Sequence, residues 1–294
     1  MKLATIILNY NSSADCHKCI SYLKAQQDVE HEIVVVDNCS REDDRKVVEA
    51  LCKEQGCTFI ANNENKGYNA GNNVGLRYAA GKGYEFAMIA NPDMEFPQTD
   101  YLATLLAKMQ EDEDIVICGS DIVTPEGIHQ SPMYKDGNWR GSFGWIKEIL
   151  GKKKKNDAYD FIDNYNESHY CHKVSGCCFM IRMSFLKSID FFDEMVFLYC
   201  EEAILSRQVE MSGKRGYYLS TAQAIHRHIK SEKSDPIKRF KVWRKSRCYF
   251  IDKYSNDHWF GKQIAKLSMK LYVTTLIMYY KFTEYVIHHQ NNIH

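Results

Sequence analysis

Residues 85–96 read EFAMIANPDMEF, and this stretch decides the fold. Its first part, from Phe86 to Ala90, is a continuous apolar run of strand length, which is typical of a strand buried on both faces in the middle of a parallel sheet. Pro92 cannot donate a hydrogen bond to a neighbouring strand, so we expect the strand to end there. Asp93 then lies at the carboxyl end of a central strand, where open α/β sheets place ligands. A plain turn is the alternative, because Asn, Pro and Asp all favour turns.

Similar apolar runs alternate with helical patterns along the chain. We expect strands at 3–8, 32–37, 57–61, 86–90, 115–119, 173–182 and 215–219. Strands that alternate with helices predict an α/β fold: a Rossmann-like, mainly parallel sheet flanked by helices, with right-handed crossovers. Residues 125–170 are irregular, and a long irregular segment in a compact domain is either functional or mobile.

The composition is that of an ordinary globular chain. Its 294 residues carry 38 basic and 38 acidic side chains, so no clustered positive field predicts nucleic-acid binding. The length fits either one large domain or one domain with an appendage. We expect a domain at 1–231, with a nucleotide-binding half at 1–120 and an acceptor-binding or catalytic half at 121–231, and a C-terminal helical extension at 232–294.

The eleven cysteines are scattered along the chain. Cys16 and Cys19 have CxxC spacing, but no second pair follows at the spacing of a zinc site. The sequence begins with a strand pattern and no signal peptide, and it contains no run of the roughly 18 apolar residues that a spanning helix needs. We therefore expect reduced thiols in the core of a cytoplasmic protein.

Polar groups follow the expected strands, and the carboxyl ends of parallel strands collect at one edge of a sheet. In chain order these groups are Asn9 and Tyr10, Asp37, the loop at 62–75, Asp93, Glu201 and Glu202, and His226 and His228. The loop is dense in Asn and Gly, where glycines let the backbone approach a ligand closely. The helix that follows it offers N–H groups to an anion. A nucleotide, a diphosphate, a cation and a base are served by such a set.

Two of these groups have an ordinary structural alternative. Glu201 and Glu202 stand at the start of an expected helix, where acidic residues also serve as plain capping groups. A lone histidine is usually structural, whereas two histidines on one face of a strand, after a carboxylate cluster, favour a metal-binding role and a structural role equally.

Seven motifs carry a resemblance to a known family. They are ILNYN at 7–11, VVVDNCS at 34–40, NKGYNAGNNVGL at 65–76, NPDM at 91–94, VSGCCFMIR at 174–182, FDEMVFLYCEE at 192–202 and HRHIKS at 226–231. In this order and spacing they resemble the family 2 glycosyltransferases, which are inverting enzymes of the GT-A fold. The resemblance is closest to the bacterial rhamnosyltransferase-like branch that builds surface polysaccharides.

The resemblance implies a nucleotide-diphosphate sugar as donor. The residues implied in its binding are Asn9, Tyr10, Asp37, Asn38, Asn65, Gly67, Asn69, Gly71, Asn72, Asn91 and Gly176. Asp93 stands where the DxD motif of the family ends, which implies Mg²⁺ or Mn²⁺ on the diphosphate. His226 matches the C-terminal histidine of the family best, and His228 is in reserve. Because Asn91 replaces the first carboxylate of the motif, the metal would depend more on phosphate oxygens and water.

The catalytic base of the family is the Asp of an ED pair, and Glu202 is aligned with it. The extra methylene of Glu moves the carboxylate by about a bond length, and catalytic geometry is demanding, so Glu201 is a second candidate. The implied reaction transfers a hexosyl or deoxyhexosyl unit, with inversion, to a hydroxyl of a glycan or lipid-linked acceptor.

Other functions and partners stay open. A sugar nucleotidyltransferase would need a Gly-rich loop with Arg and Lys after the first strand, where ILNYNSS stands instead. A binding or scaffold subunit would keep the fold without the chemistry. For the C-terminal helices we expect packing on the domain or pairing in a homodimer. The alternative is a basic and aromatic surface lying on the inner face of the plasma membrane.

Overall fold

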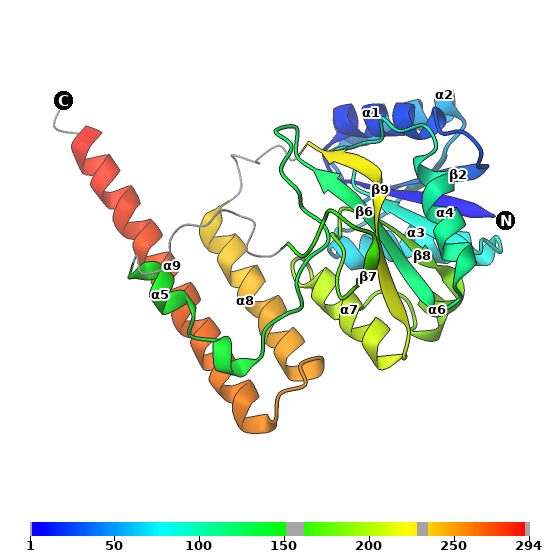
Figure 1. Ribbon diagram of the computed structural model, residues 1–294. Helices are drawn as coiled ribbons and strands as arrows, with labels where there is room; N and C mark the ends of the chain where they lie inside the picture. The colour runs from blue at the N-terminus through cyan, green and yellow to red at the C-terminus, as the bar shows by residue number, and fades with distance from the viewer. Residues whose placement is uncertain (1, 151–161, 228–234, 292–294) are drawn as a thin grey trace. The chain divides into compact units, whose positions relative to one another are not determined.

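The computed structural model describes residues 2–150, 162–227 and 235–291 (Figure 1). The chain divides into two compact units. Among the described residues, the first unit holds 2–135, 162–197 and 201–227, and the second holds 136–150, 198–200 and 235–291. Part of the irregular segment thus belongs with the C-terminal helices, which no pattern in the sequence indicates.

The first unit has an alternating order of strands and helices. It consists of β1 (Leu3–Asn9), α1 (Ser13–Lys24), β2 (His31–Asp37), α2 (Glu42–Gln55), β3 (Thr58–Ala61), α3 (Tyr68–Gly81), β4 (Phe86–Ala90), β5 (Met94–Glu95), α4 (Tyr101–Glu111), β6 (Ile115–Val123), β7 (His169–Cys171), β8 (Cys178–Arg182), α6 (Met183–Ser188), α7 (Glu201–Met211) and β9 (Arg215–His226). The second unit contains η1 (Trp139–Gly141), α5 (Trp145–Ile149), α8 (Pro236–Lys253) and α9 (Trp259–Asn291).

In the described part of the chain, one sheet holds the strands in the order β3-β2-β1-β4-β8-β6-β9-β5, with β7 also paired to β9. Neighbours β3, β2, β1 and β4 are parallel, and so are β6 and β9. The mainly parallel α/β fold is therefore confirmed. Strand β8 departs from it, because it runs antiparallel to both β4 and β6.

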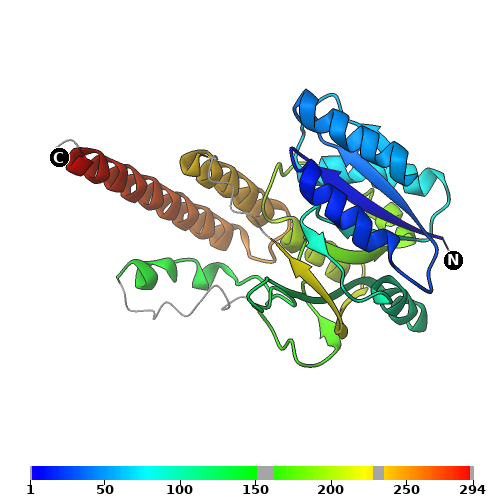
Figure 2. The ribbon, with the colours of Figure 1, turned by 90° about the horizontal axis from the view of Figure 1, so that it is seen from above.

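Helices cover both faces of this sheet, because alternate residues of each buried strand point to opposite faces. Leu3 and Ile7 of β1 pack in one core, with the apolar sides of α1, α2 and α4. Ile6 and Leu8 pack in the other core, with α3, α6 and α7. Figure 1 shows α1 and α2 together on one side of the strands, and Figure 2 shows the same pair from above.

Several boundaries differ from expectation. The strand predicted at 173–182 begins only at Cys178, and Lys173 to Cys177 form an irregular approach to it. The strand predicted at 215–219 continues to His226 as one long β9. Its register with β6 shifts at two places, between Ile115 and Ile117 and between Ser120 and Asp121. Such bulges take up extra residues, so β9 stays paired with β6 along its length.

All eleven cysteines are free thiols in the structure. Cys16 and Cys19 lie on the buried face of α1 and belong to the core, together with Cys52 and Cys178. Burial raises the pKa of the Cys16 and Cys19 thiols well above the ordinary value, so they stay protonated at neutral pH. The CxxC spacing therefore reflects helical packing.

The second unit is built around α8 and α9, which lie side by side (Figures 1 and 2). The indole of Trp145 donates a hydrogen bond to the Ser268 hydroxyl over 2.9 Å and stacks on the Tyr272 ring. Gly261 lets Trp139 pack directly on α9, because a Cβ there would lie 2.6 Å from the indole. The segment 139–150 thus completes the small core of these helices.

None of the helices in residues 2–150, 162–227 and 235–291 has an apolar stretch long enough to cross a lipid bilayer.

The packing of α3 on the sheet gives a test of the fold. A Cβ on Gly75 would lie 2.6 Å from Cγ2 of Ile6 and 3.1 Å from Cγ2 of Val36. We expect Gly75→Ala to lower the free energy of unfolding by about 1–3 kcal/mol, because overpacking a dense core displaces its neighbours. Urea denaturation followed by circular dichroism measures this change.

Gly81→Ala is the matched control, since Gly81 ends the same helix with open space around it. There we expect a gain of about 0.5–1 kcal/mol, because alanine restricts the unfolded chain. Equal stability of the Gly75→Ala protein and the wild type would contradict the close approach of α3 to β1.

Candidate active site

The carboxyl ends of β1, β2, β4 and β9 meet at one edge of the sheet, together with the amino end of β8. The reversed direction of β8 brings its approach segment to this edge, and the Asn91 N–H donates to the Cys177 carbonyl over 2.8 Å. Most of the sequence-predicted residues therefore come together in space.

Asn9 and Asp37 are both buried and lie opposite each other in the register of β1 and β2. The Asn9 amide nitrogen lies 3.0 Å from Asp37 Oδ1 and 2.9 Å from Asp44 Oδ2. Burial raises the pKa of the Asp44 carboxyl, but the hydrogen bonds from Asn9 and Ser13 together outweigh this effect. The pKa of Asp44 therefore lies below its ordinary value. Tyr10, the next residue, has half its surface exposed (51%) and is accessible to a ligand at this edge.

The loop before α3 is held by amide groups. The Asn38 side chain donates to Asn65 Oδ1 over 3.1 Å, and Asn65 Oδ1 also accepts the Gly67 N–H over 2.9 Å. Gly67 has φ +107°, and a Cβ there would lie 2.3 Å from the Phe197 carbonyl oxygen. The expected close approach at Gly67 is thus made by another segment of the chain. Ligand binding by these residues stays a prediction.

The asparagines of α3 hold the turn after α6. The Asn69 amide donates to the Asp193 carbonyl over 2.8 Å, and Asn73 exchanges hydrogen bonds with the Phe192 backbone. Asn72 donates to the Tyr68 carbonyl over 3.1 Å within the helix.

Gly71 supports the same arrangement by packing. A Cβ on it would lie 2.6 Å from Leu8 Cδ1 and 3.1 Å from the side chain of Asn38. This glycine therefore has a packing role in the structure, and its predicted role toward a nucleotide sugar stays a prediction.

Tyr68 joins three parts of the site. Its hydroxyl lies 3.0 Å from Asn91 Oδ1 and 2.8 Å from the Gly176 carbonyl oxygen. The N–H of Gly176 in turn donates to Oε1 of Glu202 over 3.3 Å. Burial and the nearby Cys177, Glu201 and Glu202 raise the pKa of the Tyr68 phenol well above its ordinary value, so it remains a donor.

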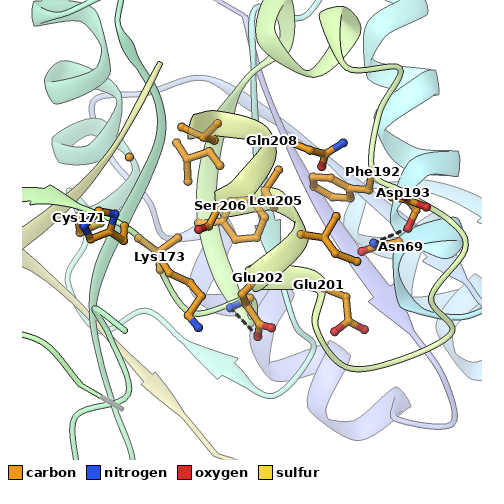
Figure 3. A pocket seen from close by; sticks show the side chains of 18 of the residues that line it. Asn69, Cys171, Lys173, Phe192, Asp193, Glu201, Glu202, Leu205, Ser206 and Gln208 are labelled. Atoms are coloured by element: carbon orange, nitrogen blue, oxygen red, sulfur yellow. Dashed lines mark hydrogen bonds between the residues drawn. The ribbon is translucent and has the colours of Figure 1, made fainter. Parts of the chain in front are cut away.

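Glu201 and Glu202 form the first turn of α7, where the helix dipole favours negative charge. Both line a pocket beside α7, together with apolar side chains such as Phe192 and polar ones such as Lys173 (Figure 3). The two residues before them, Tyr199 and Cys200, have φ of +73° and +70°. This left-handed conformation costs about 1–2 kcal/mol for each non-glycine residue, so the chain enters α7 through two strained residues.

Asp93 and His226 form an ion pair, with 3.3 Å between Oδ2 and Nε2. The other ring nitrogen of His226, Nδ1, lies 2.8 Å from Oε1 of Gln130. Burial lowers the pKa of His226, but the hydrogen bond with Asp93 and the neighbouring Cys177 outweigh it and raise the pKa to about 10. His228 lies outside the described residues, so its predicted role has no structural counterpart.

This pair has the donor chemistry of a divalent-cation site. A carboxylate and an imidazole meet at the sheet edge. A second carboxyl, that of Asp15, lies near enough for the negative charge of Asp93, together with burial, to raise its pKa. Within the described parts of the chain, no group of three or more metal-ligating side chains occurs. A cation held by Asp93 and His226 would complete its coordination with phosphate oxygens and water.

Comparison with known proteins identifies the family. The model of the family described as "Glycosyl transferase family 2" matches residues 5–190. The chain belongs to this family. The resemblance inferred from the seven motifs is thereby confirmed, and the nucleotidyltransferase alternative is not supported.

Two curated relatives of this family 2 chain are named as glycosyltransferases. The low-salt glycan biosynthesis hexosyltransferase Agl10 of Haloferax volcanii is 29% identical over 203 residues, which are 68% of this chain and 59% of the relative. An N-acetylglucosaminyl-diphospho-decaprenol L-rhamnosyltransferase of Mycobacterium tuberculosis is 27% identical over 86 residues, 29% of this chain and 28% of the relative. The chain thus spans about three fifths of the length of Agl10.

Solved structures share the GT-A fold with this family 2 chain. Residues 1–349 of S. aureus TarS superpose with a TM-score of 0.56 at 17% identity, covering 92% of this chain and 71% of that one. The mannosyltransferase PcManGT from Pyrobaculum calidifontis, in complex with GDP-Man and Mn²⁺, gives 0.58 at 15% identity, covering 92% and 69%. At these identities the likeness establishes the fold.

Four residues of the site were missed in the sequence. Asp44 had a signal: it shares the apolar face of α2 with Val48 and Leu51, where a carboxylate is unusual. Asn73 had a weaker one, because it follows Asn69 by one helical turn. Tyr68 and Gln130 had none, since their partners lie far away in the chain.

The His226–Asp93 pair predicts a pH dependence. Because the pKa of His226 is raised above its unfolded value, the pair stabilises the fold fully below pH ~6.5, and this stability is lost as the pH rises through about 10. We expect the NMR signal of His226 to titrate near pH 10 in the wild type and at least about 2 pH units lower in Asp93→Asn.

Asp190→Asn is the control, since the Asp190 side chain is 94% exposed and pairs with Arg77. It should leave the titration unchanged, and His226→Gln assigns the signal. An unchanged titration in Asp93→Asn would show that Asp93 does not hold the proton on His226.

The Tyr68 hydroxyl gives a second test. We expect Tyr68→Phe to lower the free energy of unfolding by about 1 kcal/mol, because the oxygens of Asn91 and Gly176 lose their donor. Chemical denaturation measures the loss. Tyr134→Phe is the control on a half-exposed tyrosine (50%), and we expect it to be neutral. A Tyr68→Phe protein as stable as this control would refute the bridging role.

Proposed function

We propose that the chain is an inverting glycosyltransferase that moves a hexosyl or deoxyhexosyl unit from a nucleotide-diphosphate donor to an acceptor hydroxyl. The observation that carries this proposal is the link from the Asn91-Pro92-Asp93 turn through Tyr68 and Gly176 to Glu202. Three hydrogen bonds thus connect the turn that holds Asp93 with Glu202, and this connection supports a site that combines diphosphate binding with proton removal.

Glu202 is the proposed base. The Gly176 N–H orients its carboxylate, and a larger residue at 176 would meet Glu202 Oε1 at 2.7 Å. In the reaction Glu202 accepts the proton of the acceptor hydroxyl as that oxygen attacks the anomeric carbon and the nucleoside diphosphate leaves. A single displacement inverts the anomeric centre, which develops oxocarbenium character as in glycoside hydrolysis. Glu201, in the same pocket, is the second candidate for this role.

Asp93 and His226 are the proposed holders of Mg²⁺ or Mn²⁺. The cation supplies positive charge that stabilises the leaving diphosphate. Because the raised pKa keeps His226 protonated, the imidazolium offsets the charge of Asp93 at neutral pH, and it must lose its proton to become a ligand.

The relatives suggest the class of acceptor and the cellular compartment. The rhamnosyltransferase name specifies a saccharide on a diphospho-decaprenol carrier, and Agl10 is named for glycan biosynthesis. We therefore propose a glycan or lipid-linked saccharide acceptor in surface polysaccharide synthesis. The free cysteines suit a reducing compartment, which supports a cytoplasmic reaction.

Donor turnover tests this function. We expect one preferred donor in a panel of UDP-, GDP- and dTDP-sugars, hydrolysed with Mg²⁺ or Mn²⁺ and not after EDTA. Glu202→Gln should lower turnover about 10²–10⁴-fold while calorimetry still detects nucleotide binding, because the amide cannot accept a proton. Asp93→Asn should weaken donor binding only when metal is present.

Glu113→Gln, on an exposed acidic residue outside the site, is the matched control and should keep full turnover. Turnover that survives Glu202→Gln but not Glu201→Gln would move the base to Glu201. If neither turnover nor nucleotide binding is found, the chain is a binding or scaffold subunit and the proposal fails.

A further inference from the structure

Helix α9 carries a row of exposed apolar side chains along one face. These are Phe260, Leu267, Leu271, Met278 and Phe282, and they are 58%, 54%, 45%, 66% and 65% exposed. At 100° per residue they fall within an arc of about 60° and extend over about 33 Å of helix. We call these five residues the α9 stripe.

The opposite face of α9 accounts for the packing within its unit. Ala265, Met269 and Val273 are buried there, and Ser268 receives the hydrogen bond from Trp145. The packing of the second unit therefore uses mainly the face of α9 away from the stripe, whose side chains keep about half or more of their surface exposed. Isolated exposed apolar residues are common, whereas an aligned row of five on one helix is typical of an interaction surface.

The charge around the stripe indicates what it binds. Residues 235–291 contain eleven Lys and Arg against four Asp and Glu, although the whole chain is neutral. Lys270 and Lys281 are exposed and project along one border of the stripe. An apolar row bordered by lysines, on a helix too polar to span a bilayer, is the pattern of a helix that lies in the interface of anionic lipid.

A second copy of the chain fits this surface less well. A seam between two α9 helices would need apolar residues spaced alternately by four and three. From Phe260 that series runs through Ile264, Leu267, Leu271 and Met278, but it is interrupted by the polar Thr274 and ends at the charged Lys281. Two copies of a strongly basic unit would also repel each other, whereas an anionic surface attracts both.

We propose that the α9 stripe docks this chain on an anionic lipid surface, with the apolar side chains among the acyl chains and Lys270 and Lys281 at the headgroups. This inference does not depend on glycosyl transfer, because it rests on exposure and charge in the helical unit alone. If the proposed function also holds, docking would bring the enzyme to the surface that carries a lipid-linked acceptor.

Flotation of the full-length chain with vesicles tests the proposal. We expect binding to phosphatidylcholine vesicles that contain phosphatidylglycerol, and much weaker binding to phosphatidylcholine alone. Leu271→Gln combined with Met278→Gln should lower the vesicle partition coefficient at least about tenfold, because two apolar side chains no longer enter the lipid. Lys270→Gln combined with Lys281→Gln should lower it about tenfold on the anionic vesicles only.

The matched control is Val47→Gln combined with Met211→Gln, two apolar residues of α2 and α7 that are 55% and 65% exposed. It should bind vesicles like the wild type, and circular dichroism should show unchanged helix content in every variant. Vesicle binding that is absent, or equal in stripe variant and control, would overturn the proposal. So would sedimentation without lipid that finds a dimer in the wild type and a monomer in the stripe variant.

Discussion

The hydroxyl of Tyr68 is the contact on which the geometry of the site depends. It contacts Asn91 in the turn that ends β4 and Gly176 in the segment that leads into β8. The N–H of Gly176 in turn donates a hydrogen bond to Glu202. Three segments that are far apart in the chain are thereby held at fixed distances by one buried phenol. Because its pKa is raised well above the ordinary value, the phenol keeps its proton at neutral pH.

Asparagine side chains connect the segments around the site by hydrogen bonds without adding charge. The side chains of Asn9, Asn38, Asn69 and Asn73 each reach another segment of the first unit. An amide both donates and accepts, so it can satisfy a buried backbone group and a neighbouring side chain together. Carboxylates in the same places would be costly to bury unless each was paired. The density of asparagine at 62–75 is thus explained by the internal scaffold, with any ligand contact added to it.

The fold could be predicted from the sequence because its central strands are short apolar runs between helical patterns. The proximity of Asp93 and His226 could also be predicted from the sequence, since both residues lie at strand ends that meet at one edge of the sheet. The direction of β8 could not, because a buried antiparallel strand and a buried parallel strand have the same apolar pattern. The contact of Gln130 with His226 could not be predicted either, because Gln130 lies in an irregular segment whose sequence has no helical or strand periodicity.

The left-handed backbone at Tyr199 and Cys200 has a consequence for how this protein could change. Two consecutive side chains there occupy a conformation that glycine adopts freely, and they stand directly before the helix that carries Glu201 and Glu202. Exchange of either residue for glycine would remove a steric cost and would also give the unfolded chain more conformational freedom. Local strain in the folded chain and conformational entropy of the unfolded chain therefore act on stability in opposite directions at these two positions, directly before the first turn of α7.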